Sequence, residues 1–314
     1  MKRFLLVTLL LMATQSRGYP QESGTNQIPG VIQSILNAFL QVTNTAGPTF
    51  SIYSATDDAS HIYTRNRAST FVGNTIGGTG IDLTAIPVWD NWDSPPPIGS
   101  NPYGGARFNG ILVTPDILLQ AHHPSAGPGY SPQTIYFVDN KNETVARTVS
   151  GHKVVTGTDI EVVRLTKTVP STITPAAVFA TGALTHNLRI PVLWTDQFRD
   201  LYIGVGVLAN DASILVYQAP ATNPFNAYWG TVHDGVVSGD SGAPYTTIIN
   251  GRLVALGTWS SGGKTSGGGS SFAGQVSAIN AAISSLGSTT TLQTIDLSGS
   301  PKVIQSSPPY PMFR

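Results

Sequence analysis

The sequence contains no cysteine at any of its 314 positions. Without cysteine the chain can form no disulfide and carry no lipid-modified cysteine, and it can use neither a thiolate nucleophile nor a cysteine-ligated zinc ion. For an exported chain, this absence fits a bacterial-type protein better than an animal digestive enzyme. Because no disulfide is possible, the fold must be held together by packing and hydrogen bonds.

Charged residues are also scarce, at 11%, and 17 basic side chains balance 17 acidic ones. No run of lysine or arginine could neutralise a phosphate backbone, so we expect no nucleic-acid partner. Glycine, serine, threonine and asparagine supply the polar share beside 40% apolar residues. This balance is typical of a β-rich globular protein.

No apolar stretch is long enough to cross a bilayer, which needs roughly 20 residues. At the N-terminus, Lys2 and Arg3 precede a short apolar run over residues 4–13, and small residues follow up to Gly18. This pattern predicts a secretory signal peptide over residues 1–18. We therefore expect an exported protein, extracellular or periplasmic, with no membrane span after cleavage.

The remainder divides into three predicted segments. Residues 19–80 form an N-terminal extension or propeptide with one short amphipathic helix over 31–40. Residues 81–287 form the main domain, in which short apolar runs alternate with turn residues. Residues 288–314 form a C-terminal tail that begins as a strand-like extension.

Within the main domain the pattern predicts many short strands and one late helix, which is typical of an all-β sandwich or barrel. The strands are expected at 110–114, 135–138, 144–148, 160–165, 243–249 and 252–259, and the helix at 276–286. Asn250-Gly251 is a strong two-residue hairpin signal between the last two strands.

The clearest chemical motif is Gly-Asp-Ser-Gly-Ala-Pro at residues 239–244. An acyl-transfer nucleophile needs its hydroxyl on a tight turn with backbone N–H groups aimed at the same carbonyl oxygen, and glycines permit both. Taken alone, the same residues also fit an ordinary polar turn before a buried hairpin.

This hexapeptide resembles the nucleophile motif of the trypsin/chymotrypsin family. Residues 114–123 resemble the strand that ends in the family's catalytic histidine, and residues 158–165 resemble the segment that begins with its aspartate. The order His, Asp, Ser differs from that of subtilisins and α/β-hydrolases. Residues 253–261 resemble the family's substrate-lining strand. Residues 272–286 resemble its closing strand and C-terminal helix.

The resemblance implies an all-β, chymotrypsin-like double β-barrel with a C-terminal helix. It implies that Ser241 is the nucleophile, His123 the general base and Asp159 the residue that orients the histidine. The backbone N–H groups of Gly239 and Ser241 would form the oxyanion hole. No cofactor is required by this chemistry.

Counting from Asp116 without gaps places His123 in the catalytic role, while His122, which follows Ala121, remains the alternative. A metal site at this pair is not expected, because adjacent residues of a strand point to opposite faces. His152 lacks supporting context and is expected to be a surface or core histidine.

The resemblance also places Gly235 at the base of the primary substrate pocket. Its walls would come from Thr258, Trp259 and Ser260, with Ser271 as a further candidate. Since none of these side chains carries a charge, we expect an uncharged substrate side chain next to the scissile bond.

Two classes of function follow. The first is a secreted serine endopeptidase acting on a protein or peptide substrate, with an esterase on the same fold as a variant of it. The second is a non-catalytic binding or structural module of a surface or phage-like assembly. Retention of all three catalytic residue types favours the enzyme.

Overall fold

The structure is a computed structural model. It describes residues 71–72, 75–76, 81–87, 110–123, 134–141, 143–181, 189–195, 201–210, 213–218, 241–249, 252–262 and 266–296. The predicted signal peptide, the predicted helix at 31–40, Gly235 and Gly239 lie outside these ranges.

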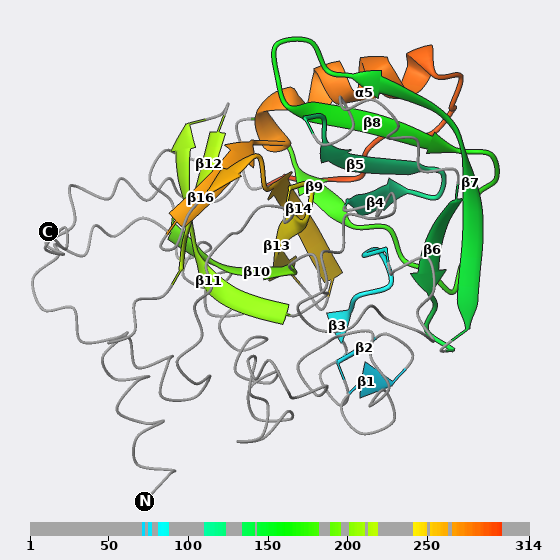
Figure 1. Ribbon diagram of the computed structural model, residues 1–314, viewed down its shortest axis with the longest axis horizontal. Coiled ribbons are helices and arrows are strands. Elements are labelled where there is room, and N and C mark those ends of the chain that lie inside the picture. Colours follow the sequence, from blue (N-terminus) through cyan, green and yellow to red (C-terminus); the bar gives the residue numbers. More distant parts are fainter. Residues whose placement is uncertain are drawn as a thin grey trace, which may run out of the picture.

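Most of the described residues are in strands (Figure 1). In chain order the strands are β1 (Phe71–Val72), β2 (Thr75–Ile76), β3 (Ile81–Asp82), β4 (Ile111–Thr114), β5 (Ile117–Ala121), β6 (Thr134–Val138), β7 (Thr144–Val154), β8 (Ile160–Leu165), β9 (Ala177–Phe179), β10 (Arg189–Thr195), β11 (Leu201–Asn210), β12 (Ser213–Gln218), β13 (Pro244–Ile249), β14 (Arg252–Thr258), β15 (Ser261–Gly262), β16 (Ser266–Ser270) and β17 (Thr294–Ile295). A 3₁₀ turn, η2 (Ala273–Gln275), leads into helix α5 (Val276–Ser285).

The strands form two large sheets and one small one. A five-stranded sheet has the order β4-β5-β8-β7-β6, and a nine-stranded sheet has the order β15-β16-β12-β11-β10-β13-β14-β9-β17. β1, β2 and β3 form the small sheet. Figure 1 shows the two large sheets side by side, with α5 lying along the five-stranded one. The predicted all-β class with a C-terminal helix is confirmed: the described chain is mostly strand, with a curled sheet and one short C-terminal helix.

Most predicted strands are confirmed because their apolar residues are buried as the pattern requires. β8 occupies the predicted range, and every residue in it except Arg164 is buried. β13 and β14 pair as a hairpin in which Ile249 is opposite Arg252. β7 is longer than predicted, since its alternating half-buried and exposed side chains continue past Thr148 to Val154.

One predicted element is wrong in position. The closing strand, expected at the start of residues 272–286, is β16, and it ends before Phe272. Its sequence, Ser-Gly-Gly-Gly-Ser, has little intrinsic preference for a strand and is typical of a loop. Pairing with β12 on one side and β15 on the other holds it extended.

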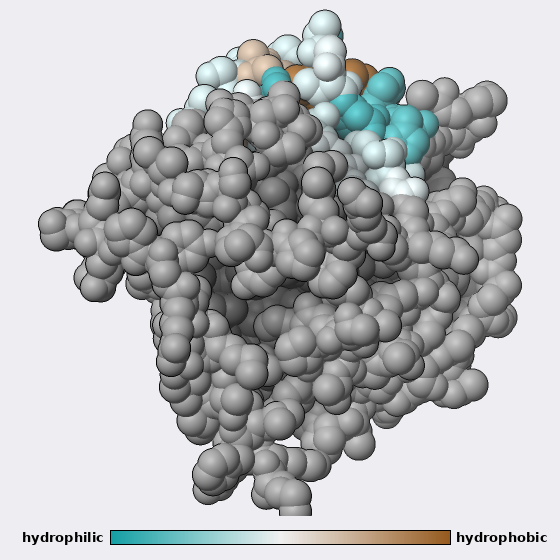
Figure 2. All heavy atoms as spheres, turned by 90° about the vertical axis from the view of Figure 1, so that its left-hand side faces the viewer, coloured by the Kyte–Doolittle hydropathy of each residue, from teal (hydrophilic) through white to brown (hydrophobic). Residues whose placement is uncertain are grey.

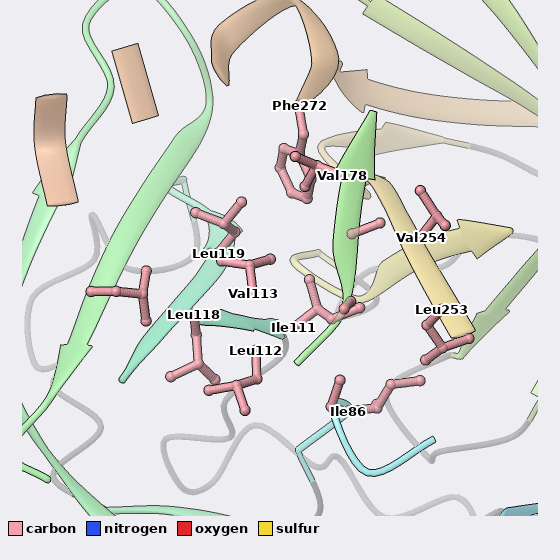
Figure 3. Packing of buried hydrophobic residues seen from close by; sticks show 14 of the residues in the cluster. Ile86, Ile111, Leu112, Val113, Leu118, Leu119, Val178, Leu253, Val254 and Phe272 are labelled. Carbon is pink, nitrogen blue, oxygen red and sulfur yellow. The ribbon is translucent and has the colours of Figure 1, made fainter. Parts of the chain in front are cut away.

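The core lies between the two large sheets. Figure 3 shows side chains of β4 and β5 on one side and of β9 and β14 on the other, with Phe272 beside them. Leu119, Val178, Val254 and Phe272 are each fully buried. Burying one such side chain contributes about 1.5–3 kcal/mol, so this layer fixes the two sheets against each other.

Helix α5 ends at a glycine turn that redirects the chain toward the core. Gly287 has φ +78°, and the N–H of Ser288 donates to Ile283 O at 3.3 Å. A left-handed glycine at this point is the usual helix stop. The following residues, 288–296, were assigned by sequence to the tail, and they lie against the body of the fold, where β17 pairs with β9.

In the part of the chain that the structure describes, no helix is long and apolar enough to span a membrane. Figure 2 shows one face of the molecule, on which the described atoms are mostly hydrophilic or neutral with a few hydrophobic ones among them.

Candidate active site

The pairing of β5 with β8 brings the predicted histidine and aspartate together. The two strands are antiparallel, with Ala121 opposite Ile160, so the end of β5 lies beside the start of β8. The ladder continues one step further, because His122 N donates to Asp159 O at 3.0 Å. His123 is therefore held next to the Asp159 side chain by the register of the sheet.

Asp159 is presented by a tight turn between β7 and β8. Val155 N donates to Ile160 O at 2.9 Å, and Thr158 N donates to Val155 O at 3.1 Å. Gly157 occupies the position with φ +77°, which side chains other than glycine adopt only with strain. The Thr158 hydroxyl donates to Val155 O and accepts from Ile160 N, which fixes the approach to Asp159.

Ser241 stands at the entrance to β13 on a second tight turn. Gly242, next in sequence, has φ +84°, so a glycine is required there. Gly242 N donates to Trp259 O at 2.9 Å, and Trp259 N donates to Ala243 O at 3.0 Å. These bonds extend the β13–β14 ladder up to the serine and hold it beside the other sheet.

The side chains of these three residues form one continuous chain of contacts. Ser241 Oγ lies 2.6 Å from His123 Nε2, and His123 Nδ1 lies 2.7 Å from Asp159 Oδ2. The second carboxylate oxygen, Asp159 Oδ1, accepts a hydrogen bond of 2.8 Å from the backbone N–H of His123. The histidine is thus held by its ring and by its backbone at once.

The carboxylate of Asp159 is stabilised in its charged form. Its partial burial raises the pKa, but the nearby Ser260 hydroxyl, the hydrogen bonds from His123 and the charge of His123 outweigh burial, so the pKa lies below its ordinary value. Asp159 is consequently an anion at neutral pH.

Two serines lie close to Asp159, Ser270 on β16 and Ser260 in the short link between β14 and β15. Asp159 N donates to Ser270 Oγ on β16 at 3.3 Å, and Ser260 faces the carboxylate. The sequence placed Ser260 in the substrate pocket and did not single out Ser270. No local pattern marks Ser270, since its partner is 111 residues away.

The other predicted pocket residues are buried. Thr258 and Trp259 are 2% and 1% exposed, and Ser260 is half-buried. The ring of Trp259 makes edge-on contacts with Trp194, at 5.8 Å between centroids, and with Tyr245, at 5.3 Å. Burial raises the pKa of the Tyr245 hydroxyl, which keeps it neutral.

The glycines of β16 make room for this aromatic group. A Cβ at Gly267 would lie 2.8 Å from the Trp259 ring and 2.5 Å from Ser261 O. A Cβ at Gly269 would lie 2.1 Å from Thr258 O. Close packing therefore requires glycine at positions 267 and 269.

The alternative histidine lies elsewhere. His122 Nδ1 is 3.7 Å from Glu161 Oε1, while the ring between Asp159 and Ser241 is that of His123. Among the described residues, no group of three or more histidine, aspartate or glutamate side chains is arranged to hold a metal ion.

Comparison with known proteins gives a likeness in fold only. No protein-family model and no curated protein matches the chain. Among solved structures, human heparin-binding protein is similar, with a TM-score of 0.41 and 15% identity, over 56% of this chain and 85% of that one. A doubly substituted variant of that human protein has a TM-score of 0.42 and 13% identity over the same shares. Function therefore has to be argued from the site.

Proposed function

We propose that the chain is an exported serine endopeptidase that cleaves peptide bonds in protein or peptide substrates through an acyl-enzyme. One observation carries the proposal: Ser241 Oγ, both ring nitrogens of His123 and the Asp159 carboxylate form an unbroken chain of contacts of 2.6 and 2.7 Å. This is the arrangement in which a neutral serine hydroxyl becomes a nucleophile.

The first half-reaction would acylate Ser241. Asp159 keeps the ring proton on His123 Nδ1, which leaves Nε2 free to take the hydroxyl proton as Oγ attacks the substrate carbonyl. The imidazolium that forms lies against the Asp159 anion. Nε2 then gives its proton to the leaving amine, the carbon–nitrogen bond breaks, and the acyl group stays on Oγ.

The second half-reaction would restore the enzyme. Water enters where the amine has left, His123 Nε2 takes one of its protons, and the resulting hydroxide attacks the acyl carbon. Collapse of the tetrahedral intermediate releases the carboxylic acid and returns the proton from Nε2 to Ser241 Oγ. No atom outside the three side chains and water is needed for proton transfer.

The developing negative charge on the carbonyl oxygen needs donors. We assign this role to the backbone N–H groups of Ser241 and Gly239, the two positions that match the oxyanion hole in the nucleophile motif of the trypsin/chymotrypsin family, which residues 239–244 resemble. The uncharged residues Thr258, Trp259 and Ser260 support a preference for an uncharged side chain beside the scissile bond, with Gly235 at the base of the pocket.

The proposal is tested by fluorophosphonate labelling of the purified protein, read by intact mass. The expected result is one adduct that is absent in Ser241→Ala and present in Ser277→Ala, a matched control on the exposed face of α5. A peptide library with mass-spectrometric readout then tests amide cleavage directly.

Each outcome has a distinct meaning. A folded protein without an adduct would contradict the proposal and favour a binding or structural module. An adduct with ester hydrolysis but no cleavage of any peptide would retain the nucleophile and replace the peptidase with an esterase. An adduct that persists in Ser241→Ala would place the reactive serine elsewhere.

A further inference from the structure

A second carboxylate lies buried close to the proposed triad. Glu161, two residues after Asp159 on β8, is 1% exposed. Its Oε2 accepts a hydrogen bond from the side-chain amide of Gln120 on β5. Its Oε1 lies 2.7 Å from Nδ1 of His152 on β7 and 3.7 Å from Nδ1 of His122.

This carboxylate is unusual for its position. Ile160, Val162 and Val163, its neighbours on β8, are buried apolar residues, and a fourth would suit the sheet. A buried carboxylate is costly unless polar partners compensate for the lost water. Glu161 has those partners on both neighbouring strands, so the arrangement is a built polar network.

The network ends at the catalytic histidine. Gln120 is the next-to-last residue of β5, His122 lies just beyond the end of the strand, and His123 follows directly. Asp159 contacts His123, while Glu161 binds Gln120 and lies 3.7 Å from His122. Asp159 and Glu161, which are two residues apart, therefore both make contacts at the end of β5, from which the proposed general base His123 extends.

We propose that Glu161 is a positioning residue for the reaction: with Gln120, His122 and His152 it fixes the end of β5 and so the placement of the His123 ring between Asp159 and Ser241. This inference rests on the proposed function. Glu161 contacts none of the three reacting side chains in the described contacts and acts through the strand.

A metal site at the same residues does not fit. No group of three or more histidine, aspartate or glutamate side chains within the described ranges is arranged to hold a metal ion. His152 Nδ1 is within hydrogen-bond distance of Glu161 Oε1, at 2.7 Å, and His122 Nδ1 lies 3.7 Å from the same oxygen. The carboxylate therefore has a holding role.

The test compares Glu161→Gln and His152→Ala with Lys153→Gln, an exposed control on the same strand as His152. Glutamine keeps the size of the side chain but places an N–H₂ group against a donor, either Gln120 or His152. We expect kcat in Glu161→Gln to fall about 10- to 100-fold with KM nearly unchanged, because misplacing a catalytic group by about 1 Å can cost about 100-fold. Lys153→Gln should match the wild type.

A second readout does not depend on turnover. A ring N–H bonded to a carboxylate gives a far-downfield proton NMR signal, which Asp159→Asn would remove and so assign to His123. In Glu161→Gln this signal should broaden or shift, while the far-ultraviolet circular dichroism stays that of the wild type. A purely structural role for Glu161 would lower the melting temperature and leave the signal and kcat of the folded protein unchanged.

The failure of each idea is distinguishable. A wild-type protein without adduct or turnover contradicts the proposed function, and the NMR signal still tests the role of Glu161. Wild-type kcat and an unchanged signal in Glu161→Gln overturn the inference. If Glu161→Gln does not fold, His152→Ala provides the test, because His152 is largely exposed and its substitution should leave the fold intact. Unchanged kcat and an unchanged NMR signal in His152→Ala would also overturn the inference.

Discussion

Asp159 binds His123 through both of its carboxylate oxygens: Oδ1 accepts the backbone N–H at 2.8 Å, and Oδ2 lies 2.7 Å from ring Nδ1. The first bond locks the position of the residue, and the second locks the orientation of its ring. A single carboxylate thus determines both the place and the tautomer of the proposed general base. Three predictions follow from this site and from the strands that support it.

Asp159→Asn should abolish most activity while leaving the fold intact. An amide can still accept the backbone N–H of His123, but its N–H₂ group facing the ring favours the tautomer with the proton on Nε2, which is unable to accept from Ser241. We expect kcat to fall roughly 10⁴-fold. Turnover of a peptide substrate measures kcat, the rate of phosphonate labelling should fall as well, and circular dichroism is the control for folding. Wild-type labelling by the folded variant would remove Asp159 from the mechanism.

The lowered pKa of Asp159 predicts a definite pH dependence of stability. Because the folded protein binds this proton more weakly than the unfolded chain, Asp159 stabilises the fold above the unfolded pKa, whose ordinary value is 3.8. That contribution is lost as the pH falls through the lower, folded pKa. Urea unfolding of wild type and Asp159→Asn from about pH 6 to about pH 3 should show their difference in unfolding free energy shrinking on acidification. A difference that stays constant over this range would contradict the assignment.

Gly269→Ala should destabilise the protein through backbone overlap. The new Cβ would lie 2.1 Å from Thr258 O and 2.8 Å from Ser260 Oγ, so β14 must move away from β16. Overpacking of this kind typically costs about 1–3 kcal/mol. The movement would also displace Ser260 from Asp159 and slow labelling.

Gly151→Ala is the matched control for that substitution. Its Cβ would meet only the Leu286 side chain, at 3.3 Å, and a side chain can shift where a carbonyl cannot. We expect its unfolding free energy to stay within about 0.5 kcal/mol of the wild type. Thermal unfolding of both variants measures the contrast, and equal melting temperatures would show that the close approach at Gly269 is relieved without cost.

The strands that the sequence predicted best are those whose residues are buried together. β8 has four apolar residues among six and is bounded by polar turns, and the structure buries all four together with Glu161. The hairpin of β13 and β14 was predictable because Asn250-Gly251 is a strong turn signal. Once β5 and β8 pair, their register brings His123 next to Asp159. Neither strand's own sequence predicts that the two strands pair with each other.

The parts that the sequence could not predict depend on contacts between distant residues. β16 is held as a strand by its neighbours against the preference of its glycines, so its position was mistaken. Ser270 reaches Asp159, and Glu161 gathers His152 and His122, only after the two sheets and their strands have assembled. His152 in isolation offered no sign of a partner, because its carboxylate lies on a different strand.

The pairing of β17 with β9 joins two segments that lie far apart in the sequence. Val178 N donates to Gln293 O, and Ala180 N donates to Ile295 O. One edge of β9 is therefore paired by a segment that comes much later in the sequence. Contacts so distant in sequence form slowly, because a long loop must close before they stabilise anything. We therefore expect the pairing of β17 with β9, which completes one edge of the nine-stranded sheet, to be one of the later steps in folding.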